Sequence, residues 1–434
     1  MMRNMRFSIF ILTASLVLAQ DPEELLKQGE SVLLPGGDFD AAESSFNAAL
    51  QADPSFAPAY QALSNLYLYK GDLNKANEYA IQAVQADEDF RDWSNQITKI
   101  GEHVQNGTRN VKQGLYDEAI KEYEAITQIH PYFSEGEFYK GLTRFRQKNL
   151  DGAAQYFSEA LKIYPGHTKA RKGLDNVTKQ FLNSGNKSYK RGDLGKAKDY
   201  YEKALAFDQN FYLAYFQLGV LEKKMGNSQL AIEHLNKVLE VKPDHDKSWF
   251  TLAVVYESDG KENYAIEHYT KAIEINPSYS KAYGNLGKLY TKQKNYDMAE
   301  DVLKTVTQTI DPEYPDGFMR LGLLYFEQEK NELAAENLLI STTLDNKDYL
   351  KYKSLAEAYN RLKKFPDASK AAQACVDLKK KFGGGWYELG VAEMGKGNTT
   401  RAKKYFEQAY KDRDYREVAG RKIEEINNPT KYEK

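Results

Sequence analysis

The chain has 434 residues, of which 41% are apolar and 28% are charged, so it can build a substantial core and is not a disordered polymer. Its formal net charge is −2, and this near balance argues against nucleic acid as a partner, because nucleic acid requires a concentrated basic face. Cys375 is the single cysteine, which excludes an internal disulfide, so stability has to come from packing.

Residues 1–19 have the pattern of an export signal. Arg3 and Arg6 precede an apolar run at 7–18, and Ala19 ends a small-residue cleavage pattern. The run is shorter than the about 20 apolar residues needed to span a bilayer, so we expect cleavage. The residue directly after the cleavage site is Gln20 and not a cysteine, so a lipoprotein is not expected. The expected location is the periplasm, with secretion or a eukaryotic lumen as alternatives, and no transmembrane segment is expected after signal removal.

From residue 20 onward the sequence repeats. In the units at 249–277 and 283–312, an aromatic residue is followed by Leu, a small residue, Tyr, a polar turn and then Ala. Apolar steps of three and four predict two amphipathic helices per unit. The alanines that open the second helices mark the register: Ala42, Ala76, Ala119, Ala153, Ala197, Ala231, Ala265, Ala299, Ala334, Ala368 and Ala402. Their separations are 34, 43, 34, 44, 34, 34, 34, 35, 34 and 34 residues.

This pattern resembles the tetratricopeptide repeat (TPR). The resemblance implies an all-α fold, a right-handed α-solenoid of about eleven helix-turn-helix units with a C-terminal capping helix. The expected organisation is a signal peptide at 1–19, repeats 1–2 at 20–90 and repeats 3–4 at 91–165. Repeats 5–11 follow at 166–414, and the capping helix with its tail occupies 415–434.

Two separations exceed the period, by 9 and 10 residues. Apolar positions continue at helical spacing before Ala119 and before Ala197, which predicts that the first helices of repeats 3 and 5 are extended. At 1.5 Å per residue the extension is about 14 Å. The alternative is a loop insertion in each. The extended helices, near 93–113 and 167–190, are candidate contact sites.

Small and large residues alternate across the predicted helix pairs. Gly185 and Ala253 stand where a first helix approaches its partner, and Tyr201 and Tyr269 stand on the facing second helices. Small residues opposite large ones allow close packing without voids.

No catalytic pattern is found: there is no Gly-rich phosphate loop, zinc-binding helix motif or serine nucleophile elbow. Cys375 falls on an alanine-type packing position and is interpreted as a buried structural thiol. His234 and His268 are 34 residues apart, and repeat duplication explains them better than a metal site. We therefore expect no enzymatic activity, cofactor, metal or small-molecule substrate.

The resemblance implies that first helices line a concave groove that binds segments of partner proteins. By position, the candidate groove residues are Phe138, Leu142, Phe145, Tyr189, Phe216, Val220, Lys247, Phe250, Val254, Lys281, Lys288, Lys292, Met319, Leu323, Phe326, Lys353, Arg361, Tyr387 and Met394. Such an aromatic and partly basic groove would suit an extended peptide with acidic residues. The alternative is that about half of the apolar candidates pack against neighbouring repeats.

The expected function is a non-catalytic scaffold or adaptor of the cell envelope, in a secretion, assembly or surface-organising complex. The alternative is a lumenal or secreted co-chaperone that holds unfolded client proteins.

Overall fold

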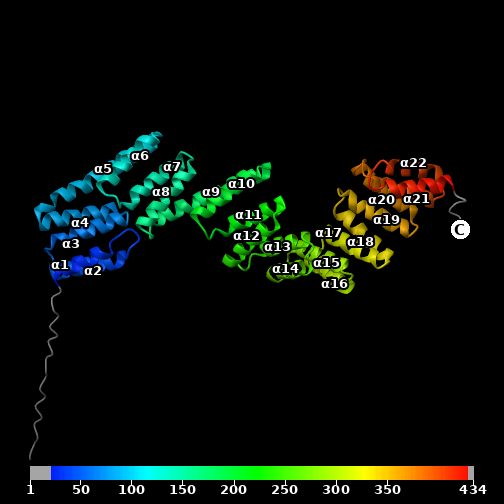
Figure 1. Cartoon of the computed structure of the whole chain (residues 1–434), viewed down its shortest axis with the longest axis horizontal. Coiled ribbons are helices and arrows are strands. Elements are labelled where there is room, and N and C mark those ends of the chain that lie inside the picture. The colour runs from blue at the N-terminus through cyan, green and yellow to red at the C-terminus, as the bar shows by residue number, and fades with distance from the viewer. Residues whose placement is uncertain (1–20, 429–434) are drawn as a thin grey trace, which may run out of the picture. The chain divides into compact units, whose positions relative to one another are not determined.

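The computed structural model describes residues 21–428, and within this range every regular element is helical (Figure 1). The predicted signal peptide and the last residues of the tail lie outside it. The first ten helices are α1 (Pro22–Val32), α2 (Phe39–Ala52), α3 (Ala57–Tyr69), α4 (Leu73–Ala86), α5 (Arg91–Gln113), α6 (Tyr116–Ile129), α7 (Ser134–Arg146), α8 (Leu150–Ile163), α9 (Thr168–Arg191) and α10 (Leu194–Phe207). The others are α11 (Tyr212–Met225), α12 (Ser228–Val241), α13 (Asp246–Ser258), α14 (Glu262–Ile275), α15 (Ser280–Lys292), α16 (Tyr296–Lys304), α17 (Pro315–Glu327), α18 (Asn331–Leu344), α19 (Tyr349–Arg361), α20 (Phe365–Leu378), α21 (Gly383–Gly395), α22 (Thr399–Ala409) and α23 (Arg416–Asn427). A 3₁₀ turn, η1 (Glu88–Phe90), and a π-helical segment, η2 (Thr305–Ile310), complete the set.

Helices α1 to α22 form eleven successive antiparallel pairs, and α23 follows them, so the predicted all-α solenoid is confirmed. The chain divides into two compact units, Met1–Ala214 and Tyr215–Lys434, which are described in turn. The divisions predicted near 91 and 166 lie inside the first unit and stay predictions.

In eight of the eleven pairs, a glycine of the first helix lies against a large residue of the second. A Cβ atom built on Gly185 would lie 2.4 Å from the ring of Tyr201, and one on Gly287 would lie 2.5 Å from Leu303. The same close approach joins Gly29 to Phe46, Gly107 to Tyr123, Gly141 to Phe157, Gly219 to Leu235, Gly322 to Leu338 and Gly390 to Phe406. In these eight pairs, the predicted contact between a small and a large residue therefore sets the spacing of the two helices.

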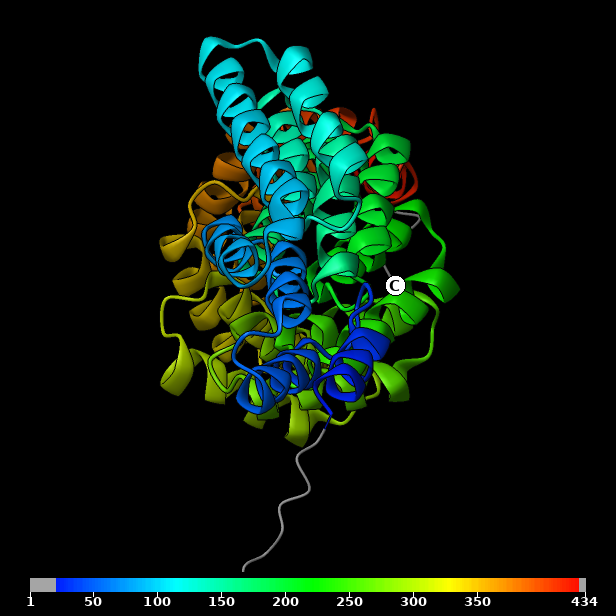
Figure 2. The same ribbon diagram turned by 90° about the vertical axis from the view of Figure 1, so that its left-hand side faces the viewer.

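The two first helices predicted to be extended are α5, which begins at Arg91, and α9, which begins at Thr168. Helix α5 has 23 residues and α9 has 24, against 13 in α7. The additional residues of both repeats therefore lie in helices and not in loops. The tip of the α5–α6 pair projects past α3 and α4 (Figure 1 and Figure 2).

In the first unit, the turns of repeats 3 and 4 cover repeats 1 and 2. The amide of Gly36 donates to the carbonyl oxygen of Ile163 at 3.0 Å, and the rings of Phe39 and Tyr164 meet edge-on at 5.2 Å. Tyr69 stacks on Tyr132 at 5.1 Å. Helix α3 is consequently buried over most of its surface, and this first helix offers no open groove to a partner.

The single 35-residue separation has a local cause. Between α14 and α15 the closing bond runs from the amide of Asn276 to the carbonyl of Ala272, four residues back. In the equivalent place after η2, the amide of Asp311 donates to the carbonyl of Val306, five residues back, at 2.7 Å. The π turn thus accommodates one extra residue within the helix, and the helix pairs on either side keep their contacts.

At the C-terminal end, Gly383, Gly384 and Gly385 are not the long turn that their composition favours. They are the buried first residues of α21, where the amide of Gly383 donates to Asp412 at 2.6 Å. Side chains here would collide with Phe382, Tyr415 and Cys375. The predicted capping helix is present as α23, and its Ile423 and Ile426 pack over Phe406.

Candidate functional site

Three successive first helices of the second unit surround a hollow of about 500 Å³. Helices α15, α17 and α19 and the turn after α15 supply the lining of this hollow, which we call the basic hollow: Lys288, Thr291, Lys292, Lys294, Arg320, Leu323, Phe326, Glu327, Glu357 and Arg361. Five of the predicted groove residues meet here, namely Lys288, Lys292, Leu323, Phe326 and Arg361. The structure therefore places this part of the predicted groove around one concavity.

The lining of the basic hollow contains five basic and two acidic side chains. Lys288 pairs with Glu257 and Lys292 with Glu262, each at 2.6 Å, so part of the positive charge is compensated at the rim. Lys294 and Arg320 have no carboxylate partner among the residues described. The Nε atom of Arg320 is buried without a hydrogen-bond partner, while its terminal nitrogen donates to Asn285 at 3.0 Å. Lys294 is exposed, so the hollow retains a donor that an anionic group could use.

Arg361 connects the charged and apolar parts of the hollow. Its guanidinium lies 4.6 Å from the ring centre of Phe326, and it also pairs with Glu357 at 2.7 Å. Lys353 pairs with the other oxygen of Glu357 at 2.6 Å. Burial acts to raise the pKa of Glu357, but Lys353 and Arg361 outweigh it and hold this pKa below its usual value. The carboxylate is therefore a fixed negative charge that orients both cations.

Glu388 on α21 lies behind this ion-paired cluster. Its side chain is 5% exposed, and burial raises its pKa to about 7 despite a hydrogen bond from the amide of Asn360 at 2.8 Å. The Oδ1 atom of Asn360 is buried without a partner. The group is placed to change charge near neutral pH.

The other predicted apolar groove residues of the second unit are partly buried against the cores of their own repeats. Phe250 and Val254 pack on the cluster around Tyr269, Phe216 packs beside Leu235, and Met319 lies against the core of α17 and α18. Tyr387 and Met394 pack with Phe406. Val220 is half-buried on α11, whereas Lys247 and Lys281 are exposed on α13 and α15. The apolar side chains thus contribute to packing, and neither they nor the two lysines line the basic hollow.

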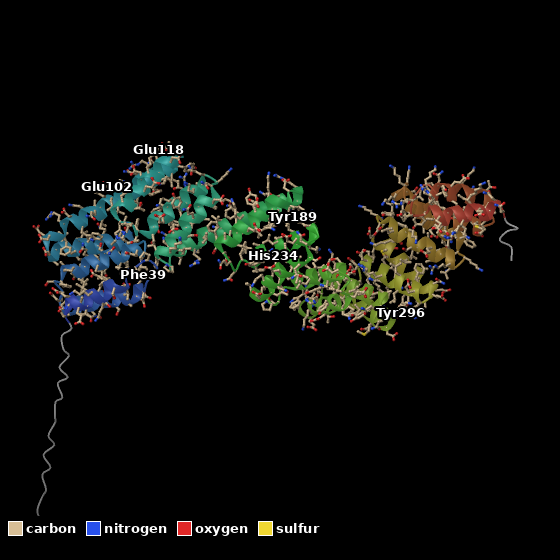
Figure 3. All side chains as sticks on the ribbon, viewed as in Figure 1. Phe39, Glu102, Glu118, Tyr189, His234 and Tyr296 are labelled. Carbon is tan, nitrogen blue, oxygen red and sulfur yellow. The ribbon has the colours of Figure 1, made fainter. Side chains whose placement is uncertain are left out.

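In the first unit, the predicted residues Phe138, Leu142 and Phe145 lie on α7 and pack against the core of α8 and α9. The ring of Phe138 lies 5.5 Å from that of His167. Tyr189 is half-buried on α9 (Figure 3).

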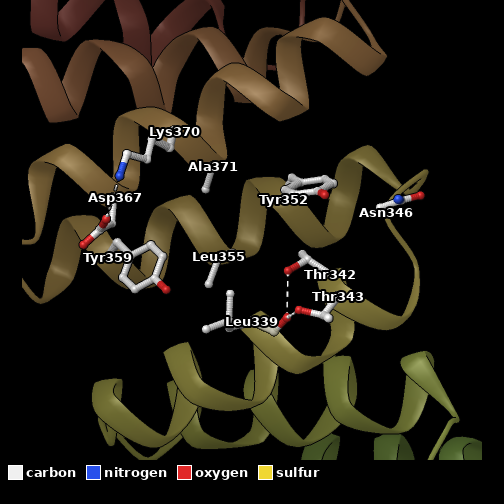
Figure 4. A pocket seen from close by; sticks show the side chains of 10 residues that line it. All are labelled: Leu339, Thr342, Thr343, Asn346, Tyr352, Leu355, Tyr359, Asp367, Lys370 and Ala371. Carbon is white, nitrogen blue, oxygen red and sulfur yellow. Dashed lines mark hydrogen bonds and ion pairs between the residues drawn. The ribbon is translucent and has the colours of Figure 1, made fainter.

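A second hollow of about 450 Å³ lies among α18, α19 and α20 (Figure 4). Leu339, Leu355 and Ala371 give it apolar walls, and Thr342, Asp367 and Lys370 bring polar groups to its edge. The weak ion pair between Asp367 and Lys370 spans 3.7 Å. No residue of the predicted groove lines it.

The sequence-based prediction omitted Arg320, Glu357, Glu257 and Glu262, which fix the charge of the basic hollow. Glu357 had a detectable signal, since it stands four residues from both Lys353 and Arg361 on one helix. The pairs of Glu257 and Glu262 join neighbouring repeats, so no spacing within a repeat identifies them.

Cys375 is fully buried in α20, and burial raises the pKa of its thiol to about 12. The predicted burial of Cys375 is confirmed. Between residues 21 and 428, no helix combines the length and the apolar character needed to cross a membrane.

Sequence models of the tetratricopeptide repeat match residues 57–90, 105–168, 200–233, 246–279, 268–301 and 384–411. Among curated proteins, the human DnaJ homolog subfamily C member 7 is 28% identical over 126 residues, which are 28% of this chain and 26% of that protein. The TPR repeat-containing protein MJ1428 of Methanocaldococcus jannaschii is 25% identical over 202 residues, which are 46% of this chain and 29% of that protein. The chain thus spans between a quarter and a third of the length of these relatives.

The chain also resembles several solved structures. The chain resembles PilF of Pseudomonas aeruginosa with 23% identity and a TM-score of 0.43, over 49% of this chain and 98% of that one. A tetratricopeptide repeat protein of Parabacteroides merdae gives 16% identity and a TM-score of 0.44, over 58% and 99% of the two chains. Eleven consecutive helix pairs, eight of which have a glycine facing a large side chain, together with the matched repeats, make this chain a tetratricopeptide-repeat protein, a member of a family that generally mediates protein–protein interaction.

Proposed function

We propose that this chain is an exported, non-catalytic scaffold of the cell envelope that holds a partner protein by a segment bound in the basic hollow. The observation that carries the proposal is the lining of that hollow, in which Arg320 and Lys294 lie beside the apolar side chains of Leu323 and Phe326. An extended segment with an acidic residue next to an apolar one complements both features. Its carboxylate would reach the donors of Arg320, and its apolar side chain would cover Leu323.

The export part of the proposal is supported by the sequence of residues 1–19. N-terminal sequencing of the chain recovered from its native cells tests it, and the expected first residue is Gln20. Recovery of the uncleaved chain from the cytosol would contradict the assignment to the envelope.

The binding part is tested by photocrosslinking from two leucines of equal exposure. Leu323 is 38% exposed in the basic hollow, and Leu333 is 40% exposed on the second helix α18. A photoreactive residue at 323 should capture a defined partner segment in envelope extract, while the same residue at 333 should not. Capture of the same proteins from both positions, or of none from 323, would contradict the proposal.

A charge reversal gives an independent measurement on the captured segment. Arg320→Glu should weaken its binding by roughly tenfold or more, because the repulsive charge replaces a donor at the floor of the hollow. Lys281→Glu is the matched control, since Lys281 is exposed on α15 outside the lining.

A further inference from the structure

The exposed surface of α9 carries a continuous basic row. The helix contains seven basic residues and one acidic residue, a net charge of +6 within a chain of net charge −2. Steps of three and four residues place six side chains on one stripe, which we call the α9 row: Lys172, Asn176, Lys179, Asn183, Lys187 and Lys190. From Lys172 to Lys190 the stripe extends about 27 Å.

The lysines of the α9 row form no ion pair with any residue between 21 and 428. All six side chains are exposed, and the opposite face of the helix buries Ala170, Val177 and Phe181. Its neighbours Lys169 and Lys203 pair with Glu135 at 2.7 Å and with Asp151 at 2.8 Å. None of the four lysines of the row has a carboxylate at ion-pair distance in the part of the chain that the structure describes.

An opposite charge of greater size lies in the same compact unit. Residues 21–90, which form repeats 1 and 2, contain 13 acidic and three basic side chains, a net charge of −10. Glu23, Glu24 and Glu30 are exposed on α1 and form no ion pair with any described residue. The carboxylates of this region that are paired bind Lys70 and Arg91, and none of them reaches α9.

We propose that the α9 row of one copy docks on the acidic first two repeats of a second copy. Complementary electrostatic potentials steer two surfaces together and set their register. Because one chain carries both a basic and an acidic surface, the basic surface of one copy complements the acidic surface of another. Because the two surfaces differ, the contact is head-to-tail, so it adds copies in a ring or a filament instead of stopping at a symmetric dimer.

Sedimentation velocity of the purified chain at low and high salt tests this proposal. Raising the salt from about 0.01 M to about 1 M shortens the Debye length from roughly 30 Å to roughly 3 Å, so complexes should form at low salt and dissociate at high salt. The variant Lys172→Glu/Lys179→Glu/Lys187→Glu/Lys190→Glu should weaken self-association by roughly tenfold or more at low salt. The variant Lys347→Glu/Lys380→Glu/Lys381→Glu/Lys404→Glu changes four exposed lysines of the second unit by the same charge and should associate normally.

A charge-swap pair identifies the acceptor. The variant Glu23→Lys/Glu24→Lys/Glu30→Lys should also lose self-association, and mixing it with the α9 variant should restore a complex of the two. A wild-type chain that stays monomeric at low salt, or an α9 variant that associates as well as the wild type, would overturn the proposal. A monomer that instead binds anionic lipid vesicles or single-stranded DNA through the row would also overturn it, because the occupant would then be a polyanion and not a second copy.

Discussion

At the scale of single residues, the missing side chain of a glycine decides how closely paired helices approach. Gly185 lies against Tyr201, whose ring is fully buried and whose hydroxyl donates to Asn186 at 2.9 Å. A Cβ atom at position 185 would lie 2.4 Å from this ring, and the buried, hydrogen-bonded tyrosine has little freedom to move away. Either the helix pair has to separate or the hydrogen bond has to break.

Gly185→Ala is therefore expected to lower the free energy of unfolding by about 1–3 kcal/mol through overpacking, although alanine is the better helix former. Gly195→Ala in the same repeat is the control, since no atom lies within 4 Å of its added carbon. The control should be neutral or gain up to about 1 kcal/mol. Thermal unfolding of both variants measures the difference, and equal melting temperatures would contradict the packing argument.

A second residue-scale prediction concerns Glu388 and pH. Its pKa is raised from 4.5 to about 7 in the fold, so between these values the native state binds more protons than the unfolded state. Stability should therefore decrease as pH rises from about 4.5 to about 7, by about 3 kcal/mol if the shift is fully expressed. Glu388→Gln removes the ionisation while keeping a group that accepts from Asn360.

Melting temperatures of the wild type and Glu388→Gln at pH 5 and pH 8 measure this effect. The variant should gain stability relative to the wild type at pH 8 and not at pH 5. Glu336→Gln changes an exposed glutamate of α18, and its melting temperature should match that of the wild type at both pH values. A constant gap between wild type and Glu388→Gln at both pH values would contradict the prediction.

The sequence predicted the residue pairs that recur and missed those that occur once. Gly185 opposite Tyr201 follows from the period, because the same two positions contact each other in successive units. Glu388 and Arg320 do not recur with the same partners. Their burial depends on neighbours from other repeats, which are Asn360 for Glu388 and Asn285 for Arg320.

At the scale of an element, the π-helical segment η2 shows how the array tolerates an insertion. Thr305 and Thr307 bond their hydroxyls back to the carbonyls of Asp301 and Leu303, both at 2.8 Å, which supports the widened turn from the side chains. Val306 and Thr307 are buried and come before the extra residue in the chain. The core contacts of α16 are therefore made before the insertion and are not displaced by it.

Deleting the exposed Gln308 should convert the π turn to an α turn and restore the 34-residue spacing. The melting temperature should stay close to that of the wild type. Deleting the exposed Lys271 from the regular helix α14 is the control, and it should lower the melting temperature by roughly 5 °C or more, because the buried positions beyond it lose register. Equal losses in both deletion variants would show that η2 holds no spare residue.

The spacing of apolar residues predicted the type of every element. It did not predict two local features, the conformation of the three glycines and the burial of α3. Three consecutive glycines favour a turn, yet Gly383–Gly385 begin α21 because Asp412 and Tyr415 approach too closely for larger residues. The burial of α3 depends on residues distant in sequence: Tyr132 stacks on Tyr69, and Ile163 belongs to the same buried cluster as Leu66. The residues from Leu66 to Tyr69 are apolar on every face of the helix, and this pattern could have indicated that α3 is buried.

At the scale of the whole molecule, each repeat contacts mainly its neighbours, so stability is close to a sum of repeat terms and nearest-neighbour interfaces. The prediction that follows concerns distance. Gly185→Ala damages the joint between α9 and α10, and its effect should fade within the adjacent repeats. Helices α19 and α20 lie in the other compact unit.

Hydrogen exchange measured by mass spectrometry tests this locality. In Gly185→Ala the amides of α9 and α10 should exchange faster than in the wild type, by roughly tenfold for each 1.4 kcal/mol lost, because local opening becomes easier. The amides of α19 and α20 should keep their wild-type rates. Gly195→Ala should leave both regions unchanged. A uniform acceleration along the chain would mean that the solenoid opens as one cooperative body, and the additive description of its repeats would then fail.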